Sequence, residues 1–183
     1  MDHIAKQERS RKRIEIILET AEKILLEDGI DQITIANISN RSGLKRTSTY
    51  KFFQTPEAIK SMLISNYLNM CALDFEEKTS NINTSEPSVV VMRSIEILFN
   101  FYSEHESAQK LLLSSSFILP VEKEPFHILS NKIQSFVEMN ISLPNIFNKD
   151  GVFRVITQII LSIFALNTKE SGSLNEVGKI EAH

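Results

Sequence analysis

The segment from Thr34 to Phe53 constrains the fold of this chain more than any other stretch. Thr34 can cap a short helix, and Ser42-Gly43-Leu44 reads as a tight turn before a second short helix over Lys45–Lys51. Glycine suits that turn because it has no β-carbon to strain a left-handed backbone. Two short helices held at a fixed angle form a helix-turn-helix, whose second helix fits the major groove of DNA. A DNA-binding regulator is therefore the first hypothesis.

An amphipathic helix is predicted before this segment, over about Ser10 to Asp28, with Gly29 ending it. Its apolar residues recur at helical spacing: Ile14, Ile17, Leu18, Ala21, Ile24 and Leu25. Five cations form a basic entry to this helix: Lys6, Arg9, Arg11, Lys12 and Arg13. Together with Ile35, Ile38 and Leu44, the stripe predicts a small three-helix core that holds the second helix of the motif outward.

Longer helices are predicted in the remainder of the chain. Thr55-Pro56 is a start signal, an N-cap followed by proline at the first helical position. The predicted helices cover residues 56–78, 88–102, 105–117, 126–140 and 148–167, with a loop over 79–87. No strand-type alternation persists, and only 5 Gly and 5 Pro interrupt the chain. The fold is predicted to be all-α, and the polar, aperiodic residues 169–183 to be a mobile tail.

Composition excludes several classes of protein. The first 60 residues hold 11 Lys and Arg against 9 Asp and Glu, whereas the rest hold 9 against 14. A mildly basic head on an acidic body suits a nucleic-acid-binding module joined to a part that does not touch DNA. The single cysteine, Cys71, excludes an internal disulfide and cysteine-based zinc sites, and it fits a reducing compartment.

Targeting and catalytic signals are not found in the sequence. The N-terminus has no signal-peptide core, and the longest apolar stretch, residues 151–166, is shorter than the roughly 20 residues that a membrane span needs. The four histidines are scattered, and no glycine-rich phosphate loop occurs. We expect a soluble cytoplasmic protein with no membrane association, no cofactor, no metal site and no enzymatic activity.

The run from Arg13 to Ile59 resembles the N-terminal domain of the TetR family of transcriptional regulators. The matching elements occur in order: Arg13-x-x-Ile-x-x-x-Ala21 with Gly29, then Ile33-Thr34-Ile35-x-x-Ile38, then Ser42-Gly43-Leu44, then Tyr50-Lys51-Phe52-Phe53 and Pro56-Glu57-Ala58-Ile59. The resemblance implies a DNA-binding domain over residues 1–54. It implies a larger helical domain for ligand binding and dimerisation over residues 55–168.

The resemblance also implies which residues contact DNA: Thr34, Lys45, Arg46, Thr47, Ser48, Tyr50 and Lys51. Lys45, Arg46 and Thr47 open the second helix of the motif and can reach base edges, since Arg or Lys bonds guanine and threonine offers a methyl group to thymine. Tyr50 and Lys51 are better placed for phosphates. Thr34, at a helix N-terminus, can bind a phosphate as well.

The implied regulatory domain has two tasks, dimerisation and ligand sensing. An apolar stripe on the last helix is the predicted dimer interface: Val152, Val155, Ile156, Ile159, Ile160 and Ile163. With the helix Phe126–Asn140 it can form half of an intersubunit four-helix bundle. Aromatic and apolar residues are the predicted walls of a pocket for a small lipophilic or aromatic effector: Met92, Phe99, Tyr102, Phe117, Phe126 and Phe136.

The resulting hypothesis is a ligand-responsive repressor that binds a palindromic operator in double-stranded DNA as a homodimer and is released by its effector. Two alternatives remain open. One is a helical protein–protein interaction module with vestigial DNA binding, favoured by Thr49 and Pro56, which depart from the family pattern. The other is a small-molecule carrier.

Overall fold

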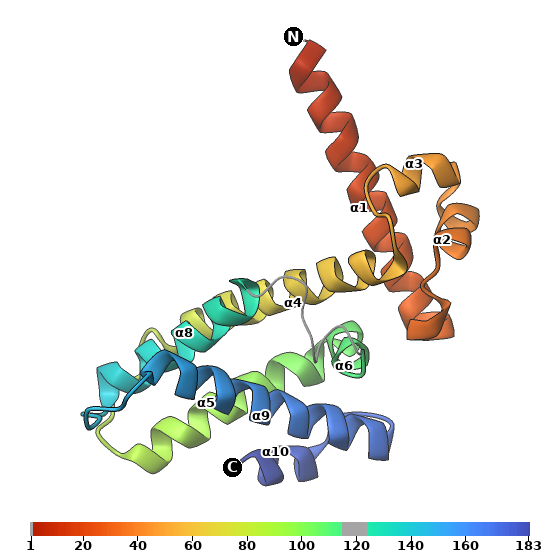
Figure 1. Cartoon of the computed structure of the whole chain (residues 1–183). Coiled ribbons are helices and arrows are strands. Elements are labelled where there is room, and N and C mark those ends of the chain that lie inside the picture. The colour runs from red at the N-terminus through yellow and green to blue at the C-terminus, as the bar shows by residue number, and fades with distance from the viewer. Residues whose placement is uncertain (1, 115–123) are drawn as a thin grey trace. The chain divides into compact units, whose positions relative to one another are not determined.

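The computed structural model describes residues 2–114 and 124–183, and every regular element in these ranges is helical (Figure 1). The chain divides into two compact units, Met1–Leu63 and Ile64–His183. The boundary falls inside α4 (Pro56–Thr79), whereas the sequence places a domain boundary just before this helix. The all-α fold is confirmed.

The first helix of unit 1, α1, spans Asp2–Asp28 and so begins earlier than the predicted Ser10. The basic residues expected before the helix are therefore part of it. No glycine or proline interrupts residues 2–28, and Lys, Arg, Glu and Gln are good helix formers, which explains the extension. Gly29 ends the helix as predicted: its φ is 93°, and its N–H donates to the carbonyl of Ile24 at 3.1 Å.

The core of unit 1 joins α1 to α2 (Ile35–Ser42), with the 3₁₀ helix η1 (Ile30–Gln32) between them. The buried apolar residues come from α1, from α2, from the segments near them and from the first turn of α4: Ile17, Ala21, Ile24, Leu25, Ile33, Ile35, Ile38, Phe53 and Ile59. Ile14 and Leu18, at the edge of the predicted stripe, are half-buried. The predicted three-helix core is present, but Leu44, which was expected in it, is half-buried.

Unit 2 contains five further described helices: α5 (Pro87–Glu104), α6 (Glu106–Leu112), α8 (Glu124–Asn140), α9 (Lys149–Ser171) and α10 (Glu176–Ala182). Helix α9 packs against α6, α8 and α10, and α5 packs against α6, α8 and α10. Aromatic rings join these elements. The ring centroid of Phe164 on α9 lies 6.2 Å from that of Phe99 and 6.3 Å from that of Tyr102, both on α5. The helix predicted over residues 105–117 ends at Leu112, and residues 115–117 lie outside the described ranges.

The C-terminal residues 169–183, expected as a mobile tail, instead continue α9 to Ser171 and then form α10. Gly172, at a φ of 82°, turns the chain, and the side chain of Asn175 caps α10 by accepting from the N–H of Val177 at 3.0 Å. Asn167 of α9 accepts from the N–H of Asn175 at 3.0 Å, and the N–H of Leu174 donates to Gln109 at 2.8 Å. The contact between Gln109 and Leu174 joins residues 65 positions apart, which a local sequence pattern does not predict.

Helix α9 is longer than the apolar stretch over residues 151–166 that the sequence predicts to be too short for a membrane span. Its 23 residues make it, among the described residues, the one helix that is long and apolar enough to cross a membrane by length and composition. In the structure it packs against three other helices, and its inner face carries the buried polar side chains of Thr157, Asn167 and Thr168. Length and composition alone are weak evidence for a membrane span, because helices inside soluble proteins meet the same criteria.

Candidate nucleic-acid interface and ligand cavities

The turn between α2 and α3 (Arg46–Tyr50) is fixed by local hydrogen bonds. The hydroxyl of Thr34 caps α2 by accepting from the N–H of Asn37 at 3.1 Å. Gly43 ends α2 with a φ of 69°, a left-handed conformation that favours glycine, and the N–H of Leu44 donates to the hydroxyl of Ser42 at 3.2 Å. The predicted cap and the predicted turn are both present, so α3 leaves α2 along a defined direction.

Helix α3 presents most of its predicted contact residues to solvent. Lys45, Arg46, Thr47, Tyr50 and Lys51 are exposed, and Ser48 is half-buried. Within the described part of the chain none of the three cations forms an ion pair, so their charges are available to a ligand. An exposed cationic and hydroxyl-bearing helix face is suited to phosphate and base-edge contacts.

Thr34 is the exception among the predicted contact residues. It is half-buried, and its hydroxyl already accepts the capping hydrogen bond from Asn37. A hydroxyl oxygen that accepts one hydrogen bond can still donate its proton, so a phosphate contact is compatible with the cap.

Thr49 packs α3 against α2 although it is smaller than the family pattern suggests. The side chain is fully buried, and its hydroxyl lies 3.4 Å from that of Ser39 on α2. Its carbonyl accepts from the N–H groups of Phe52 and Phe53 at 3.0 and 2.9 Å. A paired hydroxyl replaces apolar packing here, so this departure from the pattern leaves α3 anchored.

Arg41 is a structural residue that the sequence did not reveal. It lies in the last turn of α2 and forms ion pairs with Glu27 and Asp28 at the end of α1. The bridge ties the two helices together beside the turn. The partners are 13 and 14 residues from Arg41 in sequence, and no periodic pattern identifies such a pair.

The predicted pocket residues do not converge on one cavity. Phe99, Tyr102 and Phe136 are buried core residues, packed in edge-to-face pairs with Phe164 or Phe75. Phe126 and Met92 line two different cavities, and Phe117 lies outside the described residues. An aromatic side chain predicts burial, but it does not distinguish a cavity wall from packed core.

The most apolar of the cavities has a volume of about 480 Å³ and lies in unit 2. All of its lining residues but Ser94 are apolar: Pro87, Val91 and Ile95 of α5, Ile133 and Val137 of α8, Ile141, Leu143 and Ile146 of the following segment, Val152, Phe153, Ile156, Ile159 and Ile160 of α9, and Ala182 of α10. Ser94 donates to the carbonyl of Val90 at 2.9 Å, within its own helix. The lining therefore offers dispersion contacts and almost no polar recognition.

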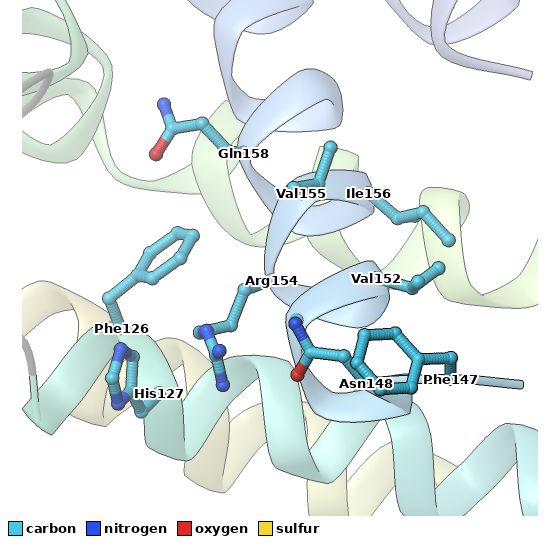
Figure 2. A pocket seen from close by; sticks show the side chains of 10 residues that line it. Phe126, His127, Phe147, Asn148, Val152, Arg154, Val155, Ile156 and Gln158 are labelled. Atoms are coloured by element: carbon cyan, nitrogen blue, oxygen red, sulfur yellow. The ribbon is translucent and has the colours of Figure 1, made fainter.

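A second, more open cleft of about 810 Å³ lies between α8 and the start of α9 (Figure 2). Figure 2 shows Arg154 extending from α9 toward Phe126 and His127 of α8, with Phe147 and Asn148 at the other end. Three predicted interface residues, Val152, Val155 and Ile156, line the same cleft.

The predicted dimer stripe on α9 is largely exposed. Val152, Val155, Ile156 and Ile159 are exposed, Ile163 is half-buried, and Leu166 extends the stripe by a further turn. Ile160 differs, because it is only 6% exposed and packs within its own chain. Ile128 and Met139 are exposed on α8. Exposed apolar faces on neighbouring helices are a common feature of protein interaction surfaces.

Two buried titratable groups of unit 2 have pKa values shifted by their surroundings. Burial raises the pKa of the Cys71 thiol well above its ordinary value, so the thiol is protonated and a poor nucleophile. Burial likewise raises the pKa of the Tyr102 phenol. Among the described residues no group of three or more His, Cys, Asp or Glu side chains could hold a metal ion.

Comparison with known proteins finds transcriptional regulators that are similar to this chain. No family model matches the chain. The helix-turn-helix-type transcriptional regulator EthR of Mycolicibacterium smegmatis is 24% identical over 94 residues, which cover 51% of this chain and 43% of EthR. The matched segment is thus less than half the length of that relative.

Solved structures of TetR-family proteins share the fold over nearly the whole chain. A TetR-family transcriptional regulator from Streptomyces coelicolor superposes with a TM-score of 0.65 at 17% identity, covering 94% of this chain and 92% of its own. SmeT, the repressor of the Stenotrophomonas maltophilia multidrug efflux pump SmeDEF, gives 0.62 at 16% identity, covering 92% and 85%. In its triclosan complex SmeT gives 0.56 at 15% identity, covering 92% and 88%. The fold is that of the TetR-family regulators, as the sequence resemblance implied, and these similar proteins are regulators rather than enzymes.

Proposed function

We propose that this chain is a ligand-responsive transcriptional regulator of the TetR family, a repressor that acts in the cytoplasm. The observation that carries the proposal is the exposed face of α3. The Thr34 cap of α2 and the turn at Gly43 hold this face outward. The resemblance to EthR and the fold shared with SmeT, which is named as a repressor, support it.

DNA recognition is assigned to α3 and to the N-terminus of α2. Lys45, Arg46 and Thr47 open α3, the end that meets base edges in such motifs, and Ser48 follows them directly. Tyr50 and Lys51 lie at the far end, where their exposed side chains suit phosphates. Thr34 reaches a phosphate from the start of α2.

Homodimerisation is assigned to the exposed faces of α8 and α9. A single helix-turn-helix meets one half-site, and two copies about 34–36 Å apart read a palindrome in successive major grooves. The stripe of Val152, Val155, Ile156, Ile159 and Ile163 on α9 is the centre of this interface, with Ile128 and Met139 contributing from α8. Burying it in a four-helix bundle removes apolar surface from water.

The effector is assigned to the apolar cavity between α5, α8 and α9. A volume of about 480 Å³ accommodates a small organic molecule. Because the lining has no charged side chain and its one hydroxyl is already bonded, the ligand is uncharged and lipophilic. The SmeT–triclosan complex shows that a protein of this fold takes a small aromatic ligand. Binding of the effector favours a conformation of the dimer in which the two copies of α3 are spaced differently. The affinity for the operator therefore falls.

The substitution Val91→Glu tests the cavity assignment. Val91 lies at the rim, 44% exposed, so the fold tolerates the change, but a carboxylate beside the cavity disfavours an apolar ligand. We expect at least about tenfold weaker binding of the uncharged fluorescent probe N-phenyl-1-naphthylamine, measured by fluorescence titration, for a cost near 1.4 kcal/mol. Leu73→Glu, at an exposed apolar residue of α4 that lines no described cavity, is the matched control. Equal losses in the two variants would reject the assignment.

Selection of bound duplexes from a random DNA pool tests the proposed function itself. The wild-type protein should enrich an inverted repeat whose half-sites lie about one helical turn apart. A pool that keeps its random composition through successive rounds would contradict the proposal.

A further inference from the structure

The N-terminal half of α1 carries a cationic stripe without a role in the three-helix core. Lys6, Arg9 and Arg13 stand at positions i, i+3 and i+7 of the helix, so they share one face, and all three are exposed. Lys12 is exposed beside them. No described residue forms an ion pair with any of these four side chains.

The opposite face of the same turns carries charges of both signs. Glu8, Arg11 and Glu15 also stand at i, i+3 and i+7, and Arg11 pairs with Glu15 at 3.3 Å. The positive charge of α1 is therefore concentrated on one side of the helix.

The direction of the cationic stripe follows from the packing of α1. Continuing from Arg13 at helical spacing, the same face passes through Ile17, Thr20 and Ile24, which are buried within unit 1, where α1 contacts α2. The cations therefore face the side of α1 on which the helix-turn-helix packs. Figure 1 shows the N-terminal turns of α1 continuing past α2 and α3.

The N-terminal part of α1 is long enough to contact several charges of an extended ligand. No residue from Lys6 to Ile16 is buried, and from Lys6 onward Ile17 is the first buried residue of the helix. At a rise of about 1.5 Å per residue, Lys6 lies about 16 Å beyond Ile17 along the helix axis. Successive cations along that length complement the repeating charges of a DNA backbone.

Building on the proposed function, we propose that Lys6, Arg9 and Arg13 of α1 bind the phosphate backbone beside the bases that α3 contacts. Lys12 supports them from the edge of the stripe. Contacts of this kind carry no sequence information, so they raise the affinity for specific and unrelated DNA alike.

The test is the salt dependence of DNA binding for two arginine variants of the same helix. The slope of log K against log salt is negative. Each lost phosphate contact lowers its magnitude by about 0.9, and a dimer loses two contacts for each substitution. The double variant Arg9→Gln/Arg13→Gln should therefore lower the magnitude of the slope by about 3.6 over about 50–200 mM salt. The same change is expected on the duplex upstream of the protein's own gene and on an unrelated duplex. Circular dichroism confirms that the helix is retained.

Arg11→Gln is the matched control, because it makes the same side-chain change on the opposite face of α1. It should keep the wild-type slope. Equal slopes for Arg9→Gln/Arg13→Gln and wild type would overturn the inference and leave the proposed function standing. A lowered slope with equal wild-type affinity for both duplexes would overturn sequence-specific reading and support the stripe. A wild-type protein that binds neither duplex would overturn both.

Discussion

Replacing Arg46 and Tyr50 together with alanine should lower the affinity for the selected operator about a hundredfold or more. Each base or phosphate contact of this kind contributes about 1–3 kcal/mol, and two are lost in each subunit. Both side chains are exposed, Tyr50 at 51%, so their removal leaves the core of unit 1 intact. Equilibrium fluorescence anisotropy with a labelled duplex measures the loss.

A charge control accompanies this experiment. Lys23→Ala removes one exposed cation from α1 outside the stripe and outside the α2–α3 motif, and it should retain operator affinity to within a few fold. Thermal unfolding should show the same midpoint for all variants. If the Arg46→Ala/Tyr50→Ala variant bound the operator as tightly as the wild type, α3 would not be the DNA-contacting helix.

The double substitution Val155→Glu/Ile159→Glu should convert the proposed homodimer into a monomer. The two side chains are 59% and 53% exposed in the isolated chain, and burying a pair of carboxylates in each half of an apolar interface is strongly unfavourable. Since a dimer binds its second half-site intramolecularly, its loss should lower operator affinity about 10²–10⁴-fold. Sedimentation velocity measures the assembly, and anisotropy measures the binding.

The control for the dimer experiment is Leu73→Glu/Val177→Glu, which introduces the same charge at two exposed apolar residues of α4 and α10. It should stay dimeric. If both double variants sediment like the wild type, the interface lies elsewhere on the chain.

Local signals predicted the geometry of the candidate DNA interface well. Thr34 as a cap, Gly43 as the turn and Thr55-Pro56 as the start of α4 each depend on a few neighbouring residues. Backbone preference and short-range hydrogen bonds determine such features, so the residue types predict them. Thr49 shows the limit, because its burial against Ser39 depends on a contact ten residues away.

Long-range packing explains what the sequence did not predict in unit 2. Helix α10 is placed by Gln109, whose side chain accepts from an N–H 65 residues later, and by Asn167. The apolar residues of α9 supply both an inner face and an exposed stripe, and periodicity did not assign Ile160 to the inner one. Aromatic residues expected to line a pocket fill the core because their partners, Phe164 and Phe75, come from other helices.

The measurement that tests the central claim most directly is the affinity of the wild-type protein for its selected duplex relative to a scrambled duplex of the same length, at one salt concentration near physiological. Specific recognition by α3 predicts binding about 10³-fold tighter or more for the selected duplex, as is typical of sequence-specific DNA-binding proteins. Equal affinity for the two duplexes would contradict the account.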